Sequence, residues 1–252
     1  MTLQSSDGVA GVRIVQTSLQ GATRSLIAAA MGAESGAAYR LVNSYSIALA
    51  DKDPAYGALL REGGVNLPDG KPLAAVLRWR TGQQFGQVRG PSLFVRCLDE
   101  GRSLGVRHYF LGGTADLLHR LTSRAESQFP GLRIAGSYAP PFRALTPSEV
   151  NAQDDLIRAA KPDVVWVGLG TPRQDFEADR LAKALNVTAV GVGAAFDFFA
   201  QTKHEAPAWV QALGMEWSFR LMSEPRRLWR RYLFGNAKFV QIAWRERQVN
   251  ER

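Results

Sequence analysis

Three glycine-rich segments, GGTAD at 112–116, GLGTPRQ at 168–174 and GVGAAFDF at 191–198, could bind a phosphate group. Glycine lets a backbone approach a phosphate closely, and the free amides of a helix N-terminus attract anions. A carboxylate, Asp69, lies between a proline and a glycine directly after the short apolar run VNLP. A Pro-Asp-Gly sequence alone is typical of a solvated surface turn, whereas at the mouth of a fold its carboxylate would face a ligand. The place of Asp69 in the fold decides between these two interpretations.

None of these segments has the spacing G-x-G-x-x-G or G-x-x-x-x-G-K-[ST]. Those spacings are the phosphate-binding signatures of dinucleotide-binding dehydrogenases and of P-loop NTPases. Both classes of enzyme are therefore disfavoured.

Short β-rich runs alternate with helical patterns from about residue 11 to residue 200. This alternation predicts an α/β fold with a mostly parallel sheet and helices on both faces. The runs near residues 163 and 188 are almost continuously apolar, as expected of strands covered on both faces. The predicted strands are residues 12–16, 39–45, 65–68, 107–113, 132–138, 163–170 and 188–196. In such sheets ligands bind beyond the carboxyl ends of the strands, where Asp69 and the glycine-rich segments follow.

Two helices have clear start signals. TPSE at 146–149 is a capping box with proline at the first helical position. TPRQ at 171–174 has the same form, with Gln174 at the third helical position.

The chain carries a net charge of +8, and the tail supplies most of it. Ten Lys/Arg and five Glu lie between residue 203 and the end, so the last 50 residues contribute +5. Basic proteins bind acidic partners, such as nucleic acid, anionic lipid or phosphorylated ligands. In the tail, Arg226, Arg227, Arg230 and Arg231 recur at helical spacing among aromatic residues, a pattern typical of membrane-surface helices. Alternatively, the tail helix packs its aromatics on the domain and exposes its arginines.

Cysteine and histidine usage predicts no metal site. The single cysteine, Cys97, excludes an internal disulfide and a Cys-based zinc cluster, and we expect it to be a small buried apolar residue. The three histidines, His108, His119 and His204, share no metal-ligand spacing. The longest apolar patch near the start, residues 26–33, is too short to span a bilayer and lacks the basic run of a secretory signal. We therefore expect a cytoplasmic protein that can associate with a membrane surface.

The chain resembles the WecG/TagA/CpsF family, glycosyltransferase family 26, over roughly residues 12–245. The matching segments occur in family order, and three of them are especially specific: GLGTPRQ, GAAFDF and GMEWSFRL…EPRRLWRRY. The other segments are VNSYSIALADKDPAY, LPDGKPLA, VRGPSLF, FLGGTAD, GSYAPPF and APAWVQAL.

The resemblance implies an inverting enzyme that moves a sugar from a UDP-sugar to a polyprenyl-diphosphate-linked saccharide in bacterial surface polysaccharide synthesis. It implies a Rossmann-like catalytic domain at residues 1–204 and a basic C-terminal membrane-associating appendage at 205–252. Neither a cofactor nor a metal is implied. The implied partners are the UDP-sugar, the lipid-linked acceptor and the inner face of the cytoplasmic membrane, and nucleic acid is not among them. A symmetric homo-oligomer is a further expectation.

The resemblance also implies roles for individual residues. Asp69 would be the general base that takes the proton of the acceptor hydroxyl. Asn43 would hydrogen-bond the donor or the acceptor, and Arg89 would meet phosphate. Gln87 aligns more directly with the family's arginine, but residues two apart on a strand share a face, so Arg89 could serve.

The nucleotide would be bound by Gly168, Gly170 and Thr171 through backbone amides, with Gln174 facing the ligand and Asp197 receiving sugar or ribose hydroxyls. Alternatively, Gln174 only closes a capping box, and Asp197 only holds the turn before the tail. Four tail arginines would bind the lipid diphosphate through their planar guanidinium groups: Arg220, Arg227, Arg230 and Arg231. Two positions depart from the family pattern: Leu41, where threonine is frequent, and Glu205, where arginine is frequent.

Two other function classes are alternatives to the glycosyltransferase. A non-catalytic, basic nucleotide- or nucleic-acid-binding module would tolerate Asp69→Asn without loss of ligand binding. A different nucleotide-dependent enzyme, such as a dehydrogenase, would bind a nicotinamide cofactor, for which the signature is missing.

Overall fold

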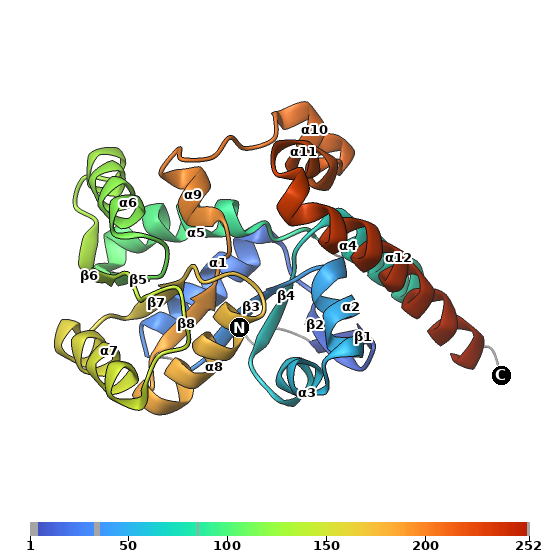
Figure 1. Cartoon of the computed structure of the whole chain (residues 1–252), viewed down its shortest axis with the longest axis horizontal. Helices are drawn as coiled ribbons and strands as arrows, with labels where there is room; N and C mark the ends of the chain where they lie inside the picture. The colour runs from blue at the N-terminus through green and yellow to red at the C-terminus, as the bar shows by residue number, and fades with distance from the viewer. Residues whose placement is uncertain (1–4, 33–35, 85, 251–252) are drawn as a thin grey trace. The chain divides into compact units, whose positions relative to one another are not determined.

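The computed structural model describes residues 5–32, 36–84 and 86–250 (Figure 1). Within these ranges, a few side chains are left undescribed: those of residues 5–7, 208, 212, 227, 230–232, 234 and 247–250. The described residues form two compact units. Unit 1 contains residues 19–40 and 90–203, and unit 2 contains the described residues up to 18 together with 41–89 and those from 204 onward.

The central sheet confirms the predicted α/β architecture. Its strand order is β4-β3-β8-β7-β5-β6, and each neighbouring pair from β3 to β6 is parallel. The first residues of β3 pair with β8 in unit 1, and the end of β3 continues into unit 2, where β4 follows. The strand bounds are β3 (Ala38–Val42), β4 (Val65–Pro68), β5 (Arg107–Leu111), β6 (Arg133–Tyr138), β7 (Val164–Val167) and β8 (Thr188–Gly191).

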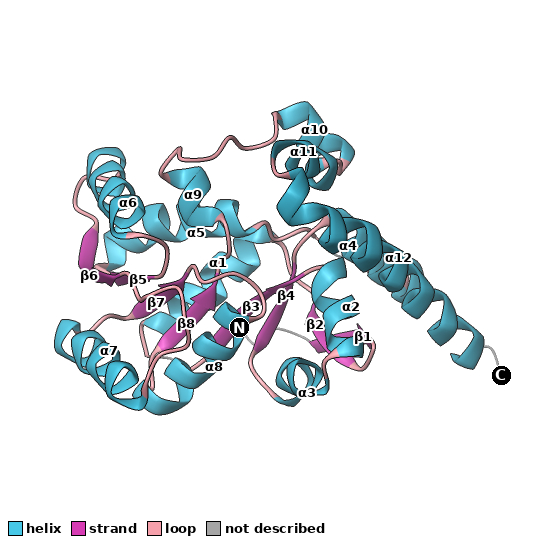
Figure 2. Ribbon diagram, in the orientation of Figure 1, coloured by secondary structure: helices cyan, strands magenta, loops and turns pink. Residues whose placement is uncertain are grey.

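Helices cover both faces of the sheet in unit 1. Figure 2 shows α7 and α8 on one face and α1, α5, α6 and α9 on the other. Every residue of β7 and β8 is buried, which explains why these strands read as unbroken apolar runs. The helix bounds are α1 (Leu19–Ala30), α5 (Gly90–Gly101), α6 (Ala115–Gln128), α7 (Pro147–Ala160), α8 (Arg173–Leu185) and α9 (Ala195–Phe199).

The direction of the chain reverses between the neighbouring strands β5 and β7. From β5 the chain passes through α6 to β6 on one side, whereas from β7 it passes through α8 to β8 on the opposite side. Crossovers to opposite sides leave a crevice at the carboxyl ends of the strands where the order reverses. The glycine-rich segments after β5 and β7 meet there: Gly168 N donates to Leu111 O at 2.8 Å, and a Cβ on Gly112 would lie 2.9 Å from the Gly168 backbone.

Cys97 and His108 are both buried in unit 1. Cys97 is fully buried, and burial raises the pKa of its thiol. His108 is fully buried beside Trp166, whose Nε1 donates to His108 Nδ1 at 3.0 Å, and burial lowers the pKa of His108 to about 4. The prediction that Cys97 is a small buried apolar residue is confirmed.

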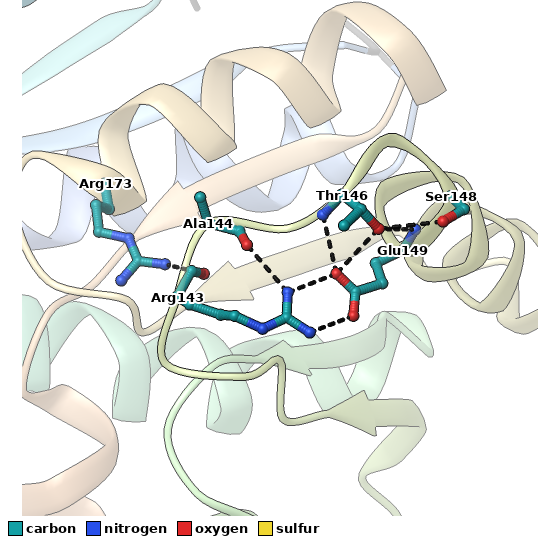
Figure 3. Close-up of polar contacts among 6 residues, drawn as sticks. All are labelled: Arg143, Ala144, Thr146, Ser148, Glu149 and Arg173. Atoms are coloured by element: carbon teal, nitrogen blue, oxygen red, sulfur yellow. Dashed lines mark hydrogen bonds and ion pairs between the residues drawn. The ribbon is translucent and has the colours of Figure 1, made fainter.

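The predicted capping box at residues 146–149 is confirmed (Figure 3). Thr146 Oγ1 accepts from Glu149 N at 3.3 Å, and Glu149 Oε2 accepts from Thr146 N at 2.9 Å. Arg143 pairs with the same Glu149 carboxylate, and Arg173 Nη2 donates to Arg143 O at 3.1 Å. The loop after β6 is thereby tied to the start of α8.

The prediction that residues 12–16 belong to the parallel sheet is wrong. They form β2 (Val12–Val15), which pairs with β1 (Ser5–Val9) in an antiparallel hairpin of unit 2. Its two turn residues, Ala10 and Gly11, have φ angles of 58° and 72°. Positive φ at both central residues gives the twist that a two-residue hairpin requires.

The core of unit 2 includes both early and late segments of the chain. Phe239 and Ile242 of α12 pack in one apolar cluster with residues of β1, β2 and helices α2 to α4. Beyond this cluster, Arg80 pairs with Glu246 at 2.7 Å, and Ala10 N donates to Glu246 Oε1 at 2.7 Å. The assignment of residues 1–204 and 205–252 to separate domains stays a prediction. The helix bounds of unit 2 are α2 (Ser44–Lys52), α3 (Pro54–Glu62), α4 (Lys71–Thr81), α10 (Ala208–Leu213), α11 (Glu216–Ser223) and α12 (Pro225–Asn250).

Candidate functional site

Asp69 lies directly after β4 and is held there by the backbone. Its N–H donates to Val42 O, at the end of β3, at 2.7 Å. On the other side, Val88 N donates to Pro68 O at 2.8 Å. Gly70 follows with a φ of 94°, a left-handed conformation that favours glycine, and α4 begins at the next residue. Asp69 is therefore a strand-end residue and not part of an isolated surface turn.

Asn43 caps helix α2 and contacts Asp69 with the same side chain. Its Oδ1 accepts from Tyr45 N at 3.1 Å and from Ser46 N at 3.2 Å. Since the amide oxygen is occupied, the amide NH₂ is the donor in the side-chain hydrogen bond between Asn43 and Asp69. Asn43 thus orients the carboxylate as well as the helix.

Asp69 lines an open pocket within unit 2. The N-termini of α2 and α4 both border it, and their amides favour an anionic ligand. Its charged lining consists of two carboxylates and two cations, Asp69 and Glu216 with Lys71 and Arg220. The other lining residues are Asn43, Ser44, Tyr45, Gly70, Pro72, Gln87, Gly214, Trp217 and Asn236.

The environment of Asp69 raises its pKa from the usual 3.8 to about 6. Burial of the carboxyl is the largest cause, and the negative charge of Glu216 adds to it. The hydrogen bond from Asn43 and the charges of Arg220 and Arg89 oppose the rise. A carboxylate with a pKa near 6 is ionised at neutral pH and is a stronger base than an ordinary aspartate.

Arg89 lies beside this pocket but is engaged by two glutamates. Its Nε lies 2.9 Å from Glu216 Oε1, and its Nη2 pairs with Glu205. Glu205, one of the departures from the family pattern, is therefore a partner of Arg89. The prediction that Gln87 and Arg89 share a strand face is wrong, because residues 86–89 form an irregular segment. Gln87 itself lines the pocket.

Sequence reasoning missed Lys71 and Glu216 as site residues. Lys71 directly follows the Pro-Asp-Gly segment, so its position at the start of α4 could have signalled it. Glu216 belongs to the family segment GMEW, whose glycine has a local reason. A Cβ on Gly214 would lie 2.8 Å from the Lys71 side chain, so glycine lets these segments approach.

Of the four tail arginines, Arg220 of α11 lines the pocket. The other three are part of α12, and their side chains lie outside what the structure describes: Arg227, Arg230 and Arg231. Their role in binding phosphate stays a prediction.

Gln174 organises two glycine-rich loops in unit 1. Its Oε1 accepts from Gly170 N at 3.1 Å and from Gly193 N at 2.9 Å, so one buried side chain holds the loops after β7 and β8 together. The predicted capping box of Thr171 and Gln174 is wrong. Helix α8 begins at Arg173, two residues after Thr171, and no side chain caps it.

Gly168 and Gly170, in the loop after β7, have different structural roles. A Cβ on Gly168 would lie 2.6 Å from the Phe196 ring, so packing excludes a side chain there. Gly170 has a φ of 76°, and a Cβ on it would meet nothing within 4 Å. The space beside the Gly170 Cα is therefore open, while its N–H donates to Gln174 Oε1.

Asp197 of α9 holds the turn that precedes residue 204. Its backbone carbonyl accepts from Thr202 N at 3.0 Å, and its carboxylate lies 3.4 Å from Lys203 Nζ. Binding of sugar or ribose hydroxyls by Asp197 stays a prediction.

The strand-end carboxylate of Asp69, the helix N-termini and the pocket cations together suit an anionic ligand. A sequence profile of the glycosyl transferase WecG/TagA/CpsF family matches residues 8–252. The chain belongs to the WecG/TagA/CpsF family of glycosyltransferases. This confirms the resemblance that the ordered segments indicated.

Two relatives of this glycosyltransferase carry the name N-acetylglucosaminyldiphosphoundecaprenol N-acetyl-beta-D-mannosaminyltransferase. The protein from Bacillus spizizenii is 31% identical over 186 residues, which are 72% of this chain and 69% of the relative. The protein from Bacillus subtilis (strain 168) is 29% identical over 202 residues, 79% of this chain and 75% of the relative. Among the described residues, no helix is both long and apolar enough to cross a membrane.

Proposed function

We propose that this glycosyltransferase moves a sugar from a UDP-sugar to a polyprenyl-diphosphate-linked saccharide, with Asp69 as the general base. The observation that carries the proposal is the Asp69 carboxylate, oriented by Asn43, with its pKa raised to about 6 in a pocket that contains cations. The names of the two Bacillus relatives support a polyprenyl diphosphate that carries N-acetylglucosamine as the acceptor. The product would serve the synthesis of a bacterial surface polysaccharide.

The proposed step is a single displacement with inversion. The acceptor hydroxyl oxygen attacks C1 of the donor sugar while Asp69 takes the hydroxyl proton. The new C1–O bond forms as the bond from C1 to the phosphate oxygen breaks, and UDP leaves with that electron pair. No further acid is required, because the diphosphate is a stable anion. The proposal assigns the neutralisation of diphosphate charge to cationic side chains, with Lys71 and Arg220 in the pocket, and requires no metal ion or other cofactor.

Nucleotide binding is assigned to the glycine-rich loops of unit 1. The open space beside Gly170, next to Thr171, supports this assignment, and so does the Gln174 side chain that holds the loop. The N–H groups of Gly168 and Gly170 donate to Leu111 O and Gln174 Oε1, so these two glycines would shape the loop around the ligand.

Membrane association is assigned to the C-terminal helices. Nine of the fifteen large apolar side chains that are exposed among the described residues lie beyond residue 204, so the exposed apolar surface is concentrated there. Four of them, Trp229, Leu233, Val240 and Trp244, are spaced by four, seven and four residues on α12. At about 100° per residue this spacing puts them on one side of the helix, apart from the buried Phe239. The proposal places this stripe on the inner face of the cytoplasmic membrane.

The test is a transfer assay with the full-length protein. A panel of UDP-sugars, including UDP-N-acetylmannosamine, is offered with a synthetic polyprenyl-diphosphate-N-acetylglucosamine acceptor, with and without EDTA. We expect transfer from one donor, unaffected by EDTA, to a product whose anomeric configuration is opposite to that of the donor. Asp69→Asn should lower kcat by about 10²–10⁴-fold, the usual contribution of a general base.

The matched control is Asp155→Asn, which removes an exposed carboxylate of α7 in unit 1. Its rate should equal that of the wild type. Absence of transfer from every donor by a folded protein, with the acceptor intact, would refute the enzymatic proposal. Full activity of Asp69→Asn would refute the role of Asp69 alone.

A further inference from the structure

A second carboxylate, Glu216, lies at the same pocket as the proposed base. It is the first residue of α11, and its side chain is 25% exposed. A like charge beside an ionised aspartate costs free energy unless it is compensated. Compensation is present, since Arg89 Nε lies 2.9 Å from Glu216 Oε1.

The ion pair of Glu216 with Arg89 is not needed simply to anchor the C-terminal segment. Glu205 pairs with the same guanidinium, and it also belongs to the segment after residue 203. The two glutamates differ in where their charge acts. Glu216 lines the pocket and is the second-largest cause of the raised pKa of Asp69, whereas Glu205 is outside the pocket lining.

We propose that Glu216 is a positioning residue for the reaction, which holds Arg89 beside the pocket and strengthens Asp69 as a base. This inference rests on the proposed role of Asp69. It makes the C-terminal segment an electrostatic part of the site, because the charge that acts on the base is carried by α11.

Three segments around Asp69 contribute charged side chains. Helix α11 carries Glu216 and Arg220, the segment 86–89 carries Arg89, and α4 carries Lys71. Tyr45 of α2 lines the pocket as a further titratable group. Glu216 is the one carboxylate besides Asp69 in the described lining, so its removal should lower the pKa of Asp69. Removal of Arg89 should raise that pKa, because a favourable positive charge is lost.

The experiment measures proton binding directly, without substrate. Full-length protein labelled with ¹³C at the aspartate carboxyl carbon is titrated by NMR, and the Asp69 signal is assigned by its loss in Asp69→Asn. We expect a wild-type midpoint near 6. In Glu216→Gln the midpoint should fall by about one pH unit. In Glu205→Gln, the matched control, it should not change.

An unchanged midpoint in Glu216→Gln would overturn the inference. An equal fall of the midpoint in Glu205→Gln would overturn it too, because the change in the pKa of Asp69 would then be transmitted through Arg89. If Glu216→Gln does not fold, Arg89→Gln decides the matter. Its midpoint should rise, and an unchanged value would contradict the charge arrangement.

The transfer assay separates this inference from the proposed function. In an active enzyme, the acidic limb of the pH profile should move with the NMR midpoint in Glu216→Gln. A shifted midpoint in a protein without transferase activity would sink the proposed function and leave the electrostatic role of Glu216 standing. Transferase activity with an unshifted midpoint would support the proposed function and overturn the electrostatic role of Glu216.

Discussion

Asp69→Asn should stabilise the protein at neutral pH while it abolishes the proposed base. The raised pKa of Asp69 means that the folded state binds this proton more tightly than the unfolded state does. Between about pH 4 and pH 6, the folded protein keeps a proton that the unfolded chain has already released. Stability therefore falls as pH rises through this interval, because the folded state then binds more protons than the unfolded one.

The expected size of the effect follows from the two pKa values. A change from 3.8 to about 6 corresponds to about 3 kcal/mol, at roughly 1.4 kcal/mol for each tenfold change in proton affinity. Asparagine has the same shape, carries no charge, and keeps an oxygen that can accept from Asn43. Asp69→Asn should therefore exceed the wild type by up to about 3 kcal/mol in free energy of unfolding above pH 7, and match it near pH 4.

Urea unfolding at a series of pH values measures this difference. Five of the six tryptophans belong to unit 2, so intrinsic fluorescence follows mainly the unit that contains Asp69. Asp51→Asn is a control of opposite sign in the same unit. Asp51 pairs with Lys238 and Arg245 of α12, and its side-chain hydrogen bond with Lys238 is the main cause of its lowered pKa.

Asp51→Asn should be less stable than the wild type at pH 7, and the difference should disappear as pH falls below the usual pKa of 3.8. The reasoning about Asp69 is refuted if Asp69→Asn and the wild type keep a constant difference from pH 4 to pH 8. It is also refuted if the difference grows toward low pH.

Two further predictions concern α12. Leu233→Ser combined with Trp244→Ser should lower binding to phosphatidylglycerol vesicles about tenfold or more in a flotation assay, because each large apolar side chain contributes about 1.5–3 kcal/mol when buried. The same change at the exposed Leu156 of α7 should leave binding unchanged, and equal loss there would contradict the assignment to α12. Phe239→Ala should lower the free energy of unfolding by about 3–5 kcal/mol in urea, since this ring is fully enclosed in the core of unit 2. Val240→Ala, at an exposed neighbour, should change it by less than about 0.5 kcal/mol, and similar effects at both positions would show that the face is misassigned.

The approximate positions of the strands were predictable because their apolar runs are a local signal. Several strand ends were not, since β3, β7 and β8 end at Val42, Val167 and Gly191, three to five residues before the predicted ends. Residues 65–68 form β4 as predicted, so the sequence correctly placed Asp69 at the end of a strand.

The pairing of β2 was not predictable from the same signals. Its apolar run is similar to those of the parallel strands, and its partner β1 is short and polar. Ala10 at a turn position with positive φ gives no sequence signal, because alanine rarely adopts this conformation.

The charges around Asp69 were also beyond local reasoning. Glu216 and Arg89 are 127 residues apart in the chain, and Arg89 and Glu205 are 116 apart. Spacing along the chain cannot reveal such pairs, so the arginine was predicted to meet phosphate while its two carboxylate partners went unnoticed. The burial of Phe239 against the hairpin and helices α2 to α4 was not predictable either, because these contacts join residues that are far apart in the chain. The basic, aromatic composition of the tail instead indicated a membrane-surface helix.

The late residues in the core of unit 2 have a consequence for biosynthesis. A ribosome releases residues 19–203 before α12 leaves the exit tunnel, so every segment of unit 1 is available for folding first. The apolar cluster that needs Phe239 and Ile242 can close only after both residues have left the exit tunnel. The carboxylate of Asp69 thus reaches its final surroundings only after the late helices have been made, and a chain that stops before residue 216 lacks the charges of Glu216 and Arg220 beside it.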